Sequence, residues 1–195
     1  MTVALDKLSF ADYCAYSDGT DRLYELVNGA LIPMSLGTGQ HGAISEFLTD
    51  CFKTEIRNQN LPWTAKDTKV GVQSPRGRRW DTSRIPDVTV LTQEQWENLA
   101  QREAIITLAD LPPLLIVEVV SDSTRSTDYR AKQTEYAARD IAEYWIVDSA
   151  EQKVVICTLV EGFYDQAIFV GDVSLVSPTF PALTLTAAQV LNACF

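Results

Sequence analysis

One glutamate, Glu118, stands inside an otherwise apolar run at residues 114–120, which reads LLIVEVV. Two prolines at 112–113 precede this run, and the polar triplet SDS follows it at 121–123. A short apolar run with such boundaries is typical of a strand that is buried on both faces. An unpaired carboxylate in that setting costs on the order of several kcal/mol. The sequence therefore predicts that Glu118 is protonated, paired with a cation or bound to a metal.

A second acid, Asp87, opens another apolar run, which spans residues 85–91 and reads IPDVTVL. Carboxylates are oxygen ligands that suit hard divalent cations. Two acids on buried strands of one small domain therefore predict a site that gathers carboxylates around a cation. Alternatively, Asp87 caps a turn after Pro86, and this interpretation stays open.

The bulk properties are those of one domain spanning 1–195. The chain has 195 residues, of which 46% are hydrophobic and 22% charged, enough for one sizeable core but not for two. No apolar run approaches the ~20 residues that span a bilayer, and the N-terminus lacks the pattern of a secretion signal. We therefore expect a cytoplasmic protein without membrane contact. The cysteines lack zinc-site spacing, so we expect reduced core thiols at Cys14, Cys51, Cys157 and Cys194.

The net charge of −10 argues against broad, nonspecific attraction to nucleic acid. Positive charge is nevertheless concentrated in one stretch that also contains a proline and a glycine, at 75 and 77. Two interpretations remain open: a solvated loop, or a local arm that contacts nucleic-acid phosphates beside the acidic site. The residues concerned are Arg76, Arg78, Arg79 and Arg84.

Periodicity and turn signals predict an α/β fold. A strand, a helix and a second strand at 113–120, 127–139 and 143–148 form a crossover unit, so those two strands are expected to be parallel. Early and late hairpins add antiparallel strands, which makes one mixed sheet flanked by helices. The remaining expected strands lie at 22–27, 30–32, 62–72, 85–91, 153–160 and 163–170, and the remaining helices at 9–17, at 41–57 and from about 186.

The helix expected after the Glu118 strand carries one lysine on its aromatic stripe. Tyr129, Lys132 and Tyr136 follow each other at spacings of three and four, so they share one helix face. If that face packs on the sheet, Lys132 points toward the carboxylates. The alternative is an exposed lysine that lays its stem along the surface, and spacing alone does not separate the two.

Two further polar residues form a second tier of candidates. His41, the one histidine of the chain, falls on the apolar side of its expected helix, which favours a core or capping role over a ligand role. Glu25 alternates with Leu23 and Val27, a pattern that points it inward.

An ordered set of motifs resembles the Uma-type family of putative restriction endonucleases, within the PD-(D/E)XK nuclease superfamily. The resemblance runs from about residue 20 to 185 and implies a restriction-endonuclease-like fold, with Glu25 and His41 among the matching positions. The matching segments are YELVNG at 24–29, His41, PDV at 86–88, LIVEVVS at 115–121, Asp128 with Lys132, and EYWIVD at 143–148.

The chain departs from the superfamily pattern at one position. Val120 stands two residues after Glu118, where the superfamily usually has its lysine. In related families the lysine lies on the following helix, so the resemblance implies that Lys132 replaces it. The departure also leaves open a descendant that has lost its activity.

The resemblance implies metal-dependent hydrolysis of DNA phosphodiester bonds. Asp87, Glu118 and the backbone carbonyl of Val119 would hold Mg²⁺ or Mn²⁺, and Lys132 would stabilise developing negative charge. A homodimer is expected because double-strand cleavage needs two sites. The alternatives are a catalytically silent nucleic-acid-binding or assembly protein with the same fold, and a Glu118–Lys132 ion pair without metal.

Overall fold

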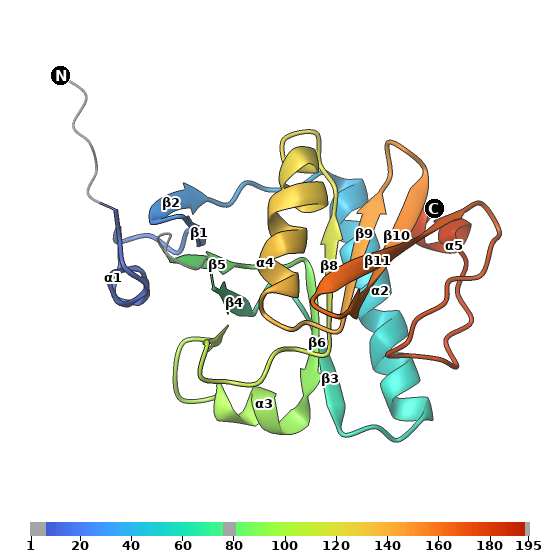
Figure 1. Ribbon diagram of the computed structural model, residues 1–195, viewed down its shortest axis with the longest axis horizontal. Helices are drawn as coiled ribbons and strands as arrows, with labels where there is room; N and C mark the ends of the chain where they lie inside the picture. The colour runs from blue at the N-terminus through green and yellow to red at the C-terminus, as the bar shows by residue number, and fades with distance from the viewer. Residues whose placement is uncertain (1–6, 76–80, 194–195) are drawn as a thin grey trace.

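The computed structural model describes residues 7–75 and 81–193, which form two mixed β-sheets flanked by helices (Figure 1). The larger sheet has six strands in the order β11-β10-β9-β8-β6-β3, and the smaller has five in the order β2-β1-β5-β4-β7. The α/β class predicted from the sequence is confirmed.

The six-stranded sheet carries the expected crossover unit. Strands β8 and β9 are parallel, with Glu118 paired in register with Ile146, while every other pair in this sheet is antiparallel. Its strands are β3 (Trp63–Asp67), β6 (Val88–Thr92), β8 (Leu115–Val119), β9 (Glu143–Asp148), β10 (Lys153–Val160) and β11 (Phe163–Val170).

The early hairpin belongs to the second sheet, so the expectation of one mixed sheet is wrong. Leu26 pairs with Ser83 across more than fifty residues of chain, and this long-range pairing has no local sequence signal. The strand expected at 62–72 also divides between the two sheets, at Thr68, whose φ is 40°. The smaller sheet contains β1 (Tyr24–Val27), β2 (Ala30–Pro33), β4 (Gly71–Ser74), β5 (Thr82–Arg84) and β7 (Ile105–Ile106).

The helix expected at 127–139 forms in two parts. A π-helix, η1 (Thr127–Lys132), continues directly into α4 (Gln133–Ala137), and the side chain of Ser126 makes no capping hydrogen bond. π-Helical turns are rare and occur frequently at functional sites. The other helices are α1 (Phe10–Cys14), α2 (Gly39–Asn58), α3 (Gln93–Asn98) and α5 (Ala187–Leu191).

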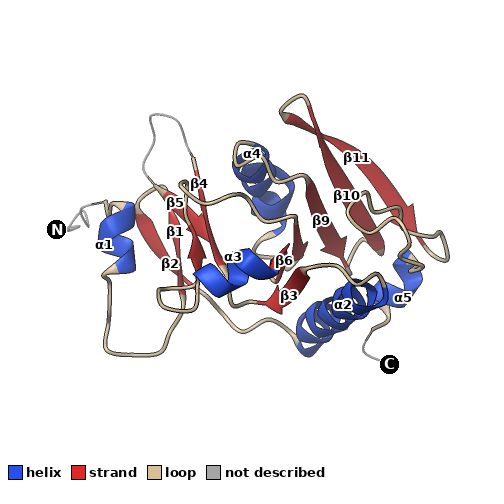
Figure 2. Cartoon of the chain, turned by 90° about the horizontal axis from the view of Figure 1, so that it is seen from below, coloured by secondary structure: helices blue, strands red, loops and turns tan. Residues whose placement is uncertain are grey.

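The two faces of the six-stranded sheet are covered by different helices, as Figure 2 shows. Helices α2 and α5 pack on the face that presents Val117 and Val119, together with Trp145. Helix α4 packs on the opposite face, where Tyr136 contacts the cluster that contains Ile116. Side chains alternate along β8, so Glu118 lies on the α4 face.

The described cysteines form no disulfide. Cys14 and Cys51 are half-buried and Cys157 is buried, all as free thiols. No described helix is both long and apolar enough to cross a membrane.

Candidate active site at the end of strand β8

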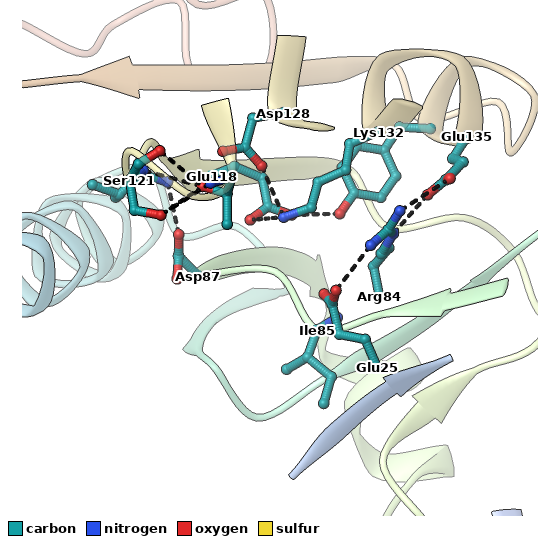
Figure 3. A network of polar contacts seen from close by, with 12 residues as sticks. Glu25, Arg84, Ile85, Asp87, Glu118, Ser121, Asp128, Lys132 and Glu135 are labelled. Carbon is teal, nitrogen blue, oxygen red and sulfur yellow. Dashed lines mark hydrogen bonds and ion pairs between the residues drawn. The ribbon is translucent and has the colours of Figure 1, made fainter. Parts of the chain in front are cut away.

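Glu118 is buried between a lysine and a tyrosine of the following helical segment (Figure 3). The ammonium of Lys132 lies 2.7 Å from Oε2 of Glu118, and the Tyr136 hydroxyl donates a 2.5 Å hydrogen bond to Oε1. Lys132 and Tyr136 are four residues apart, so one face of the segment carries both groups onto β8. The inward orientation expected for Lys132 is therefore observed, and the exposed alternative is excluded.

A third acid, Asp128, shares the same lysine. Its Oδ1 lies 3.0 Å from the Lys132 ammonium, within η1, and its side chain is 1% exposed. Among the groups that favour its ionised form, the charge of Lys132 has the largest effect on the pKa of Asp128, followed by hydrogen bonds from Thr124 and Lys132. The lysine charge is therefore the principal compensation for this buried carboxylate.

Asp87 lies directly before β6, beside the end of β8. Its Oδ2 accepts a 2.7 Å hydrogen bond from the backbone N–H of Val119, and its Oδ1 lies 2.8 Å from Nε2 of His41. Strands β6 and β8 are adjacent and antiparallel, with Val88 opposite Val117. Asp87, directly before β6, and Glu118, on β8, therefore lie at the same end of two adjacent strands, and their sharing of one cation stays a prediction.

His41 belongs to this site and not to the core, because its ring reaches Asp87 from the first turn of α2. A carboxylate only accepts hydrogen bonds, so Nε2 is the nitrogen that donates to Asp87. The hydrogen bond to Asp87 raises the pKa of His41, although burial opposes this. A Cβ at Gly37 would come within 2.8 Å of the imidazole, so the ring needs glycine at that position.

The carboxylates on this side of the sheet resist ionisation. Burial raises the pKa of Glu118 to about 8, although the charge of Lys132 acts in the opposite direction. Burial also raises the pKa of Asp128. Burial alone would lower the pKa of Lys132, but the charges of Glu118 and Asp128 outweigh it and raise the pKa above its ordinary value. The lysine therefore stays charged at neutral pH.

A second buried ion cluster lies beside the first. Arg84 binds Glu135 through Nε at 2.7 Å and Glu25 through Nη1 at 2.9 Å. Glu25 also accepts a 3.0 Å hydrogen bond from the backbone N–H of Ile85. Glu25 points inward as expected, but it contacts this arginine and not the Lys132 ammonium. The cluster joins β1 and β5 of the small sheet to α4 above the large one.

The grouping of Arg84 with an exposed arginine arm is wrong. Its side chain is 4% exposed and faces two carboxylates, because β5 is a buried central strand of the five-stranded sheet. The other members of that proposed arm, Arg76, Arg78 and Arg79, lie outside the described residues.

Two residues of these clusters were not identified as polar partners from the sequence. Tyr136 was expected to face the sheet as an aromatic, yet its hydroxyl also binds Glu118. Its position four residues after Lys132 was the available signal. Glu135 carried no such signal, because its partner Arg84 comes from a distant strand.

A comparison with protein families decides the classification of this chain. The family Uma2, described as "Putative restriction endonuclease", matches residues 10–188. The chain belongs to the Uma2 family. A search of curated proteins found no match.

A solved structure supports the fold of this Uma2 chain. The crystal structure of a "putative nuclease belonging to DUF820" from Anabaena variabilis ATCC 29413 matches with a TM-score of 0.76. The alignment covers 95% of this chain and 98% of the other at 17% sequence identity, so the likeness concerns the fold. Together, the Uma2 family and the shared fold support a nuclease.

The Uma2 site offers oxygen ligands of the kind that Mg²⁺ prefers. The described residues contain no group of three or more His, Cys, Asp or Glu side chains placed to hold a metal ion. The chain would supply two carboxylates, Asp87 and Glu118, with the peptide oxygen of Val119. Mg²⁺ commonly binds through one or two carboxylates while keeping waters and substrate phosphate oxygens. The donor types suit such a cation, while in the structure each carboxylate oxygen has a protein partner: His41 and the Val119 N–H for Asp87, and Lys132 and Tyr136 for Glu118.

Proposed function

We propose that this protein is a metal-dependent endonuclease that hydrolyses phosphodiester bonds of DNA. The observation that carries the proposal is the contact between the Lys132 ammonium and Glu118, next to the strand that presents Asp87. A buried lysine beside acids can stabilise the negative charge that develops in phosphodiester hydrolysis, and it stands in a chain whose family is described as "Putative restriction endonuclease".

Each residue of the site has a role in this proposal. Asp87, Glu118 and the Val119 carbonyl would hold Mg²⁺ or Mn²⁺, which when bound polarises the scissile phosphate and lowers the pKa of a water. Lys132 places a positive charge beside the phosphate, where negative charge accumulates in the transition state. His41 orients the Asp87 carboxylate by the hydrogen bond to its Oδ1.

The test is cleavage of supercoiled plasmid by the purified protein with Mg²⁺ or Mn²⁺. We expect nicking by the parent and its loss in Asp87→Asn, Glu118→Gln and Lys132→Met. A matched control is Lys53→Met, which removes a half-exposed lysine of α2 with only a 3.7 Å surface ion pair. Activity that survives Lys132→Met would contradict the role of this lysine.

One alternative has specific support. The Lys132 ammonium already contacts two buried acids, Val120 stands at the usual lysine position, and the net charge is −10. These features favour a catalytically silent nucleic-acid-binding or assembly protein with the same fold. Calorimetry with Mn²⁺ and the cleavage assay together separate the two functions. A protein that binds Mn²⁺ but cuts neither single-stranded nor duplex DNA is the silent form.

We also propose a homodimer, because cleavage of both strands of a duplex needs two such sites. Light scattering coupled to size-exclusion chromatography measures the mass directly. Arg76, Arg78 and Arg79 remain proposed phosphate contacts, and their joint replacement by alanine is expected to weaken DNA binding and its salt dependence.

A further inference from the structure

A pocket of about 440 Å³ opens on the small sheet, and its lining includes none of the acids or the lysine of the candidate active site. Its walls come from parts of the chain that are far apart in sequence: the segment between α1 and β1, the turn between β3 and β4, and the segment that enters β7. This volume lies in the range of about 300–1,000 Å³ that small-molecule sites occupy.

Aromatic rings and polar groups share the walls of this pocket. Tyr16 and Tyr24 pack edge to face, with ring centroids 5.5 Å apart, and the ring of Tyr16 remains 43% exposed. The Tyr24 hydroxyl donates a 2.6 Å hydrogen bond to Asp18, which holds the second ring in place. Arg22 and Glu103 add a hydrogen-bond donor and an acceptor. An exposed ring beside such groups is what a flat heteroaromatic base needs for stacking and edge recognition.

The pocket is connected to the candidate active site through the backbone around Asp87. Ile85 lines the pocket and lies two residues before Asp87. Thr68 also lines it, and its N–H donates a 3.0 Å hydrogen bond to the Asp87 carbonyl. The backbone that positions Asp87 therefore also forms part of the pocket wall.

We propose that this pocket binds an unpaired nucleobase of the DNA strand that enters the active site. The inference rests on the proposed function and narrows its substrate to DNA with single-stranded or unpaired segments, because a base inside a duplex is already stacked between its neighbours and cannot stack on Tyr16. The net charge of −10 gives little general attraction for phosphates, so stacking in the pocket supplies affinity that charge does not.

The experiment measures binding without cleavage. A fluorescently labelled single-stranded oligonucleotide is titrated with protein in EDTA, followed by anisotropy, beside a duplex of the same sequence. We expect the single strand to bind more tightly. Tyr16→Ala is expected to weaken it roughly 5- to 100-fold, the range for loss of one base–aromatic stack, whereas Tyr16→Phe retains the ring and the affinity. Phe163→Ala, which removes a 79% exposed ring of β11, is the matched control and is expected to change nothing.

An oligonucleotide that lacks its bases identifies what Tyr16 contacts. We expect the abasic strand to bind weakly, and with equal affinity, to the parent and to Tyr16→Ala. Without a base there is nothing to stack on Tyr16, so removal of the ring costs no further affinity. Equal affinity of parent and Tyr16→Ala for the normal strand, tighter binding of the duplex, or no binding of the single strand would each overturn the pocket assignment. Cleavage is measured separately. If the parent cuts DNA but Tyr16→Ala binds the single strand as tightly as the parent, only the assignment of the pocket is refuted. A parent that holds Mn²⁺, binds the strand through Tyr16 and never cuts refutes only the endonuclease.

Discussion

Replacing Lys132 with methionine tests the electrostatics of the site directly. The ammonium lies 2.7 Å from Glu118 and 3.0 Å from Asp128, and the three side chains are 6%, 4% and 1% exposed. At an effective dielectric constant of about 20, each contact corresponds to roughly 6 kcal/mol of attraction. The desolvation of the charges offsets much of this, and breaking a buried pair from one side destabilises by about 3–5 kcal/mol. We expect Lys132→Met to lose about that much stability near pH 8.

The loss is expected to depend on pH in a definite direction. The pKa of Glu118 is raised to about 8 in the folded protein, so its proton favours the fold. Stability linked to this group is complete below its ordinary value of 4.5 and declines as the pH rises toward 8. Without Lys132 the Glu118 carboxylate is harder still to ionise. The free energy of unfolding of Lys132→Met is therefore expected to be close to that of the parent at pH 5 and well below it at pH 8.

Urea unfolding at pH 5, 6.5 and 8, followed by circular dichroism, measures both effects. Lys53→Met, with its exposed ion pair, is the control and is expected to change stability by less than about 1 kcal/mol at every pH. A loss under about 1 kcal/mol for Lys132→Met, constant from pH 5 to 8, would refute the coupling between the lysine and the buried carboxylates.

Three further predictions follow from the same contacts. Mn²⁺ at a hundred times its Kd is expected to stabilise the parent by about 2.7 kcal/mol and so to raise its melting temperature. The melting temperature of Glu118→Gln is expected to stay nearly unchanged, and equal shifts in the two proteins would contradict the assigned ligand. Gly37→Ala is expected to displace the ring of His41 and weaken Mn²⁺ binding in calorimetry, whereas Gly42→Ala, whose Cβ meets nothing within 4 Å, is expected to leave it intact. Arg84→Met is expected to destabilise by about 3–5 kcal/mol in urea, and a loss typical of a surface arginine would show that its ion pairs are not buried.

The sequence alone was sufficient for the elements that carry a strong local pattern. Strands β9, β10 and β11 begin and end at the predicted residues, because apolar periodicity and turn residues define them without reference to the rest of the chain. The parallel pairing of β8 with β9 followed from the helix between them. Burial of the acid was predictable for the same local reason, since Glu118 lies inside one apolar run.

Only the tertiary structure decided which groups meet. The pairing of β1 with β5 divides the strands between two sheets and buries Arg84 against Glu25 and Glu135, although local composition had indicated an exposed loop. His41 reaches Asp87 across 46 residues for a comparable reason, because α2 packs against the sheet with its first turn at the end of β8. Periodicity specifies the face of an element on which a side chain lies. The partner on the other side of that face is set by long-range packing, which no local pattern encodes.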